Sequence, residues 1–124
     1  MLKVMLTLSG ILLFSVNVFA GTITYECKFS SFSNSKGTHK EKTPMVLTYL
    51  IDDSTKKAYF LGNLGSSEVT PITSDSQISF VEVTDSGNLM TTTIVDNLQA
   101  VHSRNTVMLG TLLPSQYYGS CVEK

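Results

Sequence analysis

The chain has 124 residues and a formal net charge of −1 at pH 7, with 9 Lys and Arg against 10 Asp and Glu. This balance gives no electrostatic attraction to nucleic acid or to an acidic membrane surface. The sequence contains two histidines and two cysteines, whereas a zinc site takes three or four nitrogen or sulfur ligands. We therefore expect no bound metal and no cofactor.

The first 20 residues have the organisation of a secretory signal peptide. Lys3 supplies the basic start, an apolar stretch follows, and Val18 and Ala20 are small residues at the positions that precede a cleavage site. The apolar stretch covers about fifteen residues, fewer than the roughly 20 that span a bilayer, so cleavage is favoured over a membrane anchor. The next residue is glycine and not cysteine. We expect a soluble periplasmic protein, not a lipoprotein, with one domain over residues 21–124.

The segment 22–29, TITYECKF, alternates apolar and polar side chains. This period of two predicts a half-buried β-strand. Cys27 in this strand has Cys121, near the C-terminus, as its single possible partner within the chain. Exported chains enter an oxidising compartment, so we expect a disulfide that joins the first strand to the last. Closing a loop of this length stabilises a fold by about 4 to 5 kcal/mol in the chain-entropy treatment.

The next segments alternate between predicted loops and strands. The polar segment 30–44 ends in proline and is predicted to be a long exposed loop or a mobile hairpin tip. The segment 45–51, MVLTYLI, is apolar on both faces and predicts a central strand packed on two sides. Turn chemistry at 52–54 is followed by a predicted strand at 57–61 and a second loop at 62–67.

The second half of the chain is predicted to be all strand and turn. Pro71 confines a weak strand to a sheet edge, and Pro114 ends a strand. Residues 78–84 and 89–95 are predicted to form a hairpin with a glycine-containing turn. Residues 100–113 are either two strands or one long bent strand. The strands expected here are 68–73, 78–84, 89–95, 100–105, 106–113 and a closing strand at 115–124.

Short strands separated by turns, with no apolar repeat of helical period beyond the signal peptide, define the expected fold class. We predict an all-β domain, a single antiparallel β-sandwich or small β-barrel of seven or eight strands with a terminal disulfide.

The sequence offers no suitable pair of side chains for catalysis. Ser103 follows His102, but adjacent strand residues face opposite sides and cannot act as nucleophile and base. Asp52 and Asp53 are explained by turn chemistry. We therefore expect a binding protein and not an enzyme.

One candidate partner-binding region is a basic patch within the predicted loop. It interrupts a chain that is slightly acidic as a whole. The alternative is a solvated loop that keeps the protein soluble. The patch consists of Lys36, His39, Lys40 and Lys42.

The other candidates lie near the C-terminus. Arg104 is the only arginine of the protein, and arginine and tyrosine are frequent interface residues. Its alternative role is an ion pair across a strand. Tyr117 and Tyr118 are adjacent, so one should face inward and the other outward, and the outward one is the contact candidate. The alternative is one tyrosine in the core and one at the rim.

The motifs YEC at 25–27 and GSC at 119–121 resemble those of small periplasmic β proteins of Gram-negative bacteria that block cell-wall-degrading enzymes. Among these, C-type lysozyme inhibitors begin with a similar Tyr-x-Cys strand and close a small antiparallel barrel. Their Ser-Gly-x-x-Tyr inhibitory loop is absent from this sequence. In size, signal peptide, all-β pattern and terminal cysteines the chain is also similar to periplasmic immunity proteins of type VI secretion systems, in particular one that neutralises a muramidase.

The resemblance implies a tight complex with a cell-wall hydrolase or secreted toxin, formed by an inhibitor that is often a homodimer. Muramidases cleave with two carboxyl groups in an open cleft. The basic loop, or Arg104 with an outward tyrosine, would meet such a cleft with complementary charge. The competing class is a small-ligand carrier with a calycin-like barrel, which should have a pocket of a few hundred Å³ on its axis. An inhibitor should instead be filled inside.

Overall fold

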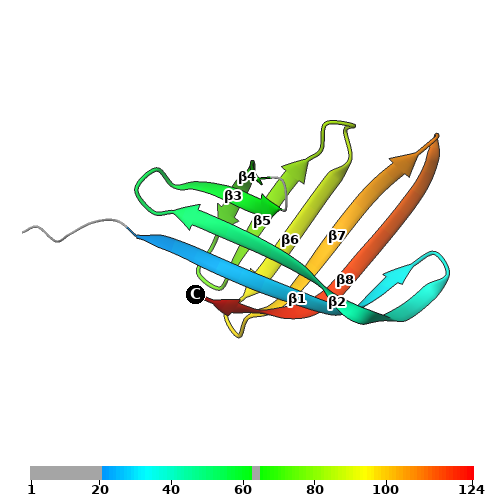
Figure 1. Ribbon diagram of the computed structural model, residues 1–124, viewed down its shortest axis with the longest axis horizontal. Coiled ribbons are helices and arrows are strands. Elements are labelled where there is room, and N and C mark those ends of the chain that lie inside the picture. Colours follow the sequence, from blue (N-terminus) through cyan, green and yellow to red (C-terminus); the bar gives the residue numbers. More distant parts are fainter. Residues whose placement is uncertain (1–20, 63–64) are drawn as a thin grey trace, which may run out of the picture.

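The structure is a computed structural model that describes residues 21–62 and 65–124, so the signal peptide predicted over residues 1–20 lies outside it. Eight antiparallel strands form a closed barrel, in which each strand pairs with its sequence neighbours and the last pairs with the first (Figure 1). The strands are β1 (Thr22–Asn34), β2 (Gly37–Asp52), β3 (Lys57–Gly62), β4 (Gly65–Thr73), β5 (Gln77–Val83), β6 (Leu89–Val95), β7 (Gln99–Met108) and β8 (Thr111–Glu123). The all-β prediction is confirmed, in its barrel form.

The predicted disulfide is present and joins the two terminal strands. Cys27 of β1 lies directly opposite Cys121 of β8, with the Cα atoms 3.9 Å apart. Nearby, Gly119 lies against the backbone of β1. A Cβ atom at this position would overlap the Lys28 carbonyl and lie 2.7 Å from the Phe29 Cα atom. The β1–β8 seam is therefore fixed by a covalent bond and by a residue without a side chain.

Large side chains fill the middle of the barrel. Phe29 and Phe80 are almost fully buried, and the ring of Tyr49 stacks on Phe80 with centroids 4.5 Å apart and planes 4° from parallel. Burying an aliphatic or aromatic side chain of this kind stabilises a fold by about 1.5–3 kcal/mol. Apolar residues that alternate along the strands thus make one continuous core. Within the described residues, no helix has the length and apolar character needed to cross a membrane.

The segment 30–44, predicted to be a long exposed loop or a hairpin tip, is a hairpin and is mostly strand. β1 continues to Asn34 and β2 begins at Gly37, so a short turn around Lys36 is what connects them. The strands were missed because, apart from Phe32, the side chains of this segment are polar or small. The two strands leave the body of the barrel as a hairpin that solvent reaches from both sides, which removes the apolar alternation. The second predicted loop is also partly wrong, since residues 65–67 belong to β4.

The two predictions based on proline have different outcomes. Pro114 does not end a strand but lies inside β8, whereas Pro71 does lie at a local edge, although β4 as a whole is not an edge strand of the closed barrel. Pairing of β4 with β3 ends at Val69, and pairing of β8 with β1 begins at Ser115. Each proline therefore sits where its strand has a neighbour on one side only, and its missing N–H interrupts no ladder.

The segment 45–51 is not packed on both sides. Leu47 and Tyr49 are buried inside the barrel, whereas the preceding residue, Val46, is 48% exposed on the outer face. The described residues form a single closed sheet, and no second layer of these residues packs on its outer face. The prediction for 100–113 is wrong in both of its forms, because β7 runs to Met108, a turn follows at 109–110, and β8 begins at Thr111. The other predicted strands are found with small shifts, and the predicted hairpin corresponds to β5 and β6.

Candidate functional site

Two hairpins project at the same end of the barrel, which we call the Arg104 end. The β1–β2 hairpin and the β7–β8 hairpin share a ladder as far as Asn34, which pairs with Ser115. Beyond that pair β8 continues without β1, and the two hairpin tips separate (Figure 1). Side chains at this end come from β1, β2, β7 and β8, so residues far apart in the sequence meet here.

Arg104 of β7 is held on three sides. Its Nε atom donates to Nε2 of His102 at 2.9 Å, and a terminal nitrogen donates to the sulfur of Met45 at 3.3 Å. Its guanidinium carbon lies 5.1 Å from the ring centroid of Tyr117, in cation–π range. The ion pairs among the described residues are elsewhere. The alternative of an ion pair across a strand is therefore not found, and Arg104 has no carboxylate partner within the described chain.

A buried chain of hydrogen bonds fixes the imidazole that holds Arg104. Nδ1 of His102 lies 2.6 Å from the Thr92 hydroxyl, which lies 2.6 Å from the Tyr49 hydroxyl. Because Arg104 has only donors, Nε2 must accept, and the ring proton sits on Nδ1 and is donated to Thr92. Burial, together with the nearby positive charge of Arg104, lowers the pKa of His102 to about 4. The imidazole is therefore neutral at pH 7.

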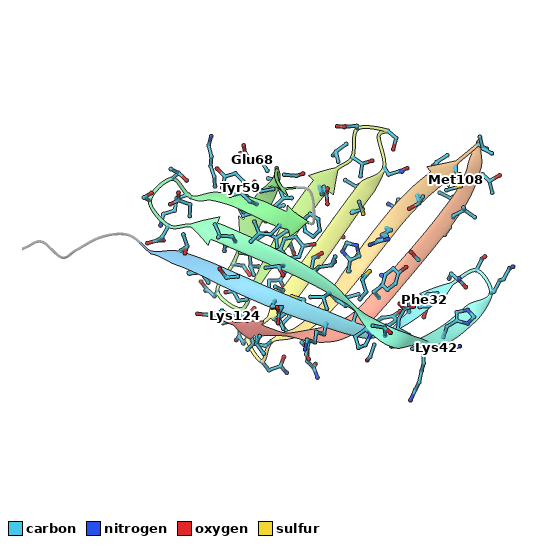
Figure 2. The ribbon with its side chains drawn as sticks, in the orientation of Figure 1. Phe32, Lys42, Tyr59, Glu68, Met108 and Lys124 are labelled. Atoms are coloured by element: carbon cyan, nitrogen blue, oxygen red, sulfur yellow. A yellow bond between two sulfur atoms is a disulfide. The ribbon has the colours of Figure 1, made fainter. Side chains whose placement is uncertain are left out.

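An aromatic row continues from Arg104 onto the β1–β2 hairpin. The ring of Tyr117 stacks on Phe32 with centroids 5.3 Å apart, and Phe32 lies 5.0 Å from the ring of His39. Figure 2 shows Phe32 at the base of the projecting β1–β2 hairpin. The structure thus brings three predicted residues together, namely His39, Tyr117 and Arg104. Phe32 was missed because its segment was predicted to be a loop.

The other predicted residues lie apart from this row. The Tyr118 hydroxyl donates to Gln116 at 3.0 Å on the outer face, and Gln116 in turn donates to Ser103. Tyr117 and Tyr118 therefore face opposite sides, as predicted. Ser103 and His102 have different partners on different faces. The basic patch is also divided, because its three lysines are exposed while His39 faces the row, and Figure 2 shows Lys42 pointing away from the barrel.

A notch lies between the two hairpins at this end. It is a hollow of about 390 Å³ lined by residues of both hairpins, including Asn34, Ser115 and Gln116. Arg104 is the charged residue of this lining, and the other lining residues are neutral. The notch therefore presents hydrogen-bonding groups around one positive charge, an arrangement suited to a carboxylate.

The tip of the β7–β8 hairpin is apolar and exposed, and sequence reasoning missed it. β6 pairs with β7 only as far as Asn105, so beyond it the ends of β7 and β8 pair with each other and with no other described strand. The turn is made by Leu109 and Gly110, both at positive φ. Figure 2 places Met108 at the far tip. We call residues 106–113 the apolar finger; its large side chains, between 45% and 100% exposed, are Val107, Met108, Leu109, Leu112 and Leu113.

A second hollow, of about 330 Å³, lies at the opposite end of the barrel. It is surrounded by the start of β1, the end of β8 and the turns β4–β5 and β6–β7. Large side chains separate it from the Arg104 end, because Phe29, Tyr49 and Phe80 fill the middle of the barrel.

Across residues 21–62 and 65–124, no three His, Cys, Asp or Glu side chains converge to form a metal-binding group. A scan against protein-family models, a search of curated proteins and a search of solved structures each found no match. A functional assignment therefore rests on the residues of the site alone.

Proposed function

We propose that this chain is an exported, non-enzymatic binding protein that inhibits a peptidoglycan-degrading enzyme, and that it acts as an immunity protein against a secreted toxin. The Arg104 end of the barrel docks on the cleft of the enzyme. The observation that carries this proposal is Arg104 itself, a guanidinium fixed by His102, Met45 and Tyr117 without a carboxylate partner among the described residues.

The charge of Arg104 supports an acidic partner. A partly buried cation has lost some of its hydration, and a carboxylate supplied by a partner restores that loss through a charge-assisted hydrogen bond. Enzymes that hydrolyse glycosidic bonds hold a pair of carboxyl groups in their cleft. Because His102 and Tyr117 already orient the guanidinium, little side-chain entropy is lost when it binds.

The surroundings of Arg104 support a protein partner in particular. Interface hot spots combine arginine and aromatic residues in a centre that neighbouring contacts shield from water. Here the aromatic row supplies the centre, and the exposed apolar finger supplies a surface that a partner can cover. The lysines of the basic patch lie on the neighbouring hairpin, where charge accelerates encounter with an acidic surface.

Export is part of the proposal. The N-terminal sequence favours cleavage after Ala20, and the Cys27–Cys121 disulfide fits an oxidising compartment. The intact mass of the protein purified from the periplasm measures both: cleavage leaves a chain that begins at Gly21, and the disulfide removes two hydrogens.

The test is capture followed by inhibition. The purified protein is used as bait in periplasmic and culture fractions, and captured hydrolases are assayed by the loss of turbidity of a cell-wall suspension. Arg104→Ala should weaken affinity for the captured hydrolase by about 100-fold, as expected for a hot spot. Replacing Lys36, His39 and Lys40 together should mainly slow association. Lys57→Gln, an exposed lysine of β3, is the matched control.

Two results would count against inhibition. One is full inhibitory strength in both the Arg104 variant and the triple variant. The other is capture that yields no hydrolase while a small ligand co-purifies with the bait, which would favour the small-ligand carrier. The hollow of about 330 Å³ opposite the Arg104 end is the specific observation in favour of that second function.

A further inference from the structure

The hollow opposite the Arg104 end has an apolar floor. Ile78 and Ile94 are buried members of the core and also line the hollow, and Ile23 and Ile51 form part of its wall. A volume of about 330 Å³ falls at the lower end of the range of small-molecule sites, which are mainly apolar with a few polar groups. Its shape and lining therefore suit a small apolar body.

Leu98 occupies the β6–β7 turn in a conformation that favours glycine. Its φ is 69°, in the left-handed region that L side chains rarely adopt. Its amide donates to Val95 at 2.8 Å and its carbonyl accepts from the Cys121 amide at 2.7 Å. The side chain packs against the core and lines the hollow. Such strain persists where the surrounding structure requires it and is frequent at ligand sites.

The charged residues in the lining are both acidic. They are Asp96 in the β6–β7 turn and Glu123 at the end of β8, and among the residues that the structure describes no Lys, Arg or His lines the hollow. Tyr25 also lines the hollow. Tyr25 lies directly opposite Glu123 in the β1–β8 ladder, so the two side chains share a face, and burial together with the negative charge of Glu123 raises the pKa of the phenol. An aromatic ring beside carboxylates is the combination that attracts ammonium groups.

We propose that this hollow binds a small amphiphile that has an apolar body and a positively charged ammonium head. The body lies against Ile78, Ile94 and Leu98, and the head lies at the rim between Asp96 and Glu123. The inference does not rest on inhibition of a hydrolase, because the site is at the other end of the barrel.

The probe for this site is decyltrimethylammonium, compared with decanoate, which has a chain of similar length and the opposite charge. Both are titrated below their micelle concentrations into protein labelled with ¹³C at the isoleucine methyls. Saturable shifts are expected at Ile23, Ile51, Ile78 and Ile94, and not at Ile72, which is exposed outside the hollow. The cation should bind at least about 10-fold more tightly than the anion, a difference that one favourable charge contact supplies.

Three variants locate the binding. Leu98→Gly keeps the backbone conformation, removes one wall and should weaken both probes at least fivefold. Asp96→Asn combined with Glu123→Gln should reduce the preference for the cation to less than twofold while leaving decanoate binding in place. Glu68→Gln removes an exposed carboxylate outside the hollow and should change neither affinity. Circular dichroism confirms that each variant is folded.

Several outcomes would overturn the proposal. These are equal affinity for the two probes, unchanged binding in Leu98→Gly, and shifts that do not saturate or that spread to Ile72. A control titration with Leu109→Ser tests whether the probes adsorb to the apolar finger. If binding disappears in this variant, the probes bind the finger and not the hollow. Inhibition of a hydrolase is measured separately, so either result stands without the other.

Discussion

Lowering the pH from 7 to 4 should destabilise the barrel through His102. Burial and the neighbouring guanidinium of Arg104 lower the pKa of this imidazole from 6.5 to about 4 in the folded protein. As the pH falls below 6.5, the unfolded chain takes up the proton and the folded protein does not, so acid favours unfolding. The contribution of His102 to the free energy of unfolding is therefore complete above pH 6.5 and falls progressively between pH 6.5 and pH 4. Below pH 4 this imidazole causes no further loss.

The size of the effect follows from the shift. Each pKa unit corresponds to roughly 1.4 kcal/mol, so a shift from 6.5 to about 4 gives a loss of about 3 kcal/mol. Domains of this size are stable by roughly 5–15 kcal/mol, so the loss is a large fraction of the total. The structural cause is direct. A protonated His102 presents a donor to Arg104 in place of an acceptor, and two positive charges then face each other.

The assay is urea unfolding followed by far-ultraviolet circular dichroism at half-unit steps between pH 4 and pH 7.5. His102→Gln keeps a carbonyl for Arg104 and an amide for Thr92 but does not titrate. Subtracting its free energy of unfolding from that of the natural protein removes the contribution of the carboxyl groups. The difference should fall by about 3 kcal/mol between pH 6.5 and 4. His39→Gln should retain the whole effect. Parallel curves for the natural protein and His102→Gln would refute the reasoning.

Three further variants test the seam and the core by equilibrium unfolding. Replacing Cys27 and Cys121 together by alanine should cost about 4 to 5 kcal/mol, because the bond closes a loop over 94 positions, and an unchanged unfolding midpoint would contradict this. Gly119→Ala should cost about 1–3 kcal/mol or more, because β1 backbone occupies the space of the new Cβ, whereas Gly21→Ala, with no atom within 4 Å, should be neutral. Tyr49→Phe removes the 2.6 Å hydroxyl contact and keeps the stacked ring, so a loss of about 1 kcal/mol is expected; a loss above 3 kcal/mol would mean that the ring has moved.

The sequence was informative wherever local chemistry determined structure. The alternation in residues 22–29 predicted a half-buried strand, and the position of Cys27 and Cys121 predicted the contact between the first and last strands. Turn residues between β5 and β6 marked that hairpin within two residues. These features depend on neighbours in the chain or on a unique pair, so they can be inferred without coordinates.

The Arg104 site could not be predicted, because it depends on register across the barrel. His102 meets Thr92 through pairing of β6 with β7, and Tyr117 meets Phe32 through pairing of β8 with β1. No spacing in the sequence encodes these contacts. The apolar finger was missed for a different reason. An apolar pattern predicts a strand but does not say whether other strands cover it. Here the neighbouring strands, β6 and β1, both end before the finger begins.

The pairing of β8 with β1 determines how late in synthesis the barrel can close. Residues near position 25 have one of their two neighbouring strands only after the last ten residues of the chain have been made. Ladders between such distant segments form slowly, because a long stretch of polypeptide must be ordered first. A chain that is still emerging from the ribosome therefore keeps its first strand half-paired. Barrel closure and thiol oxidation then follow as one late event.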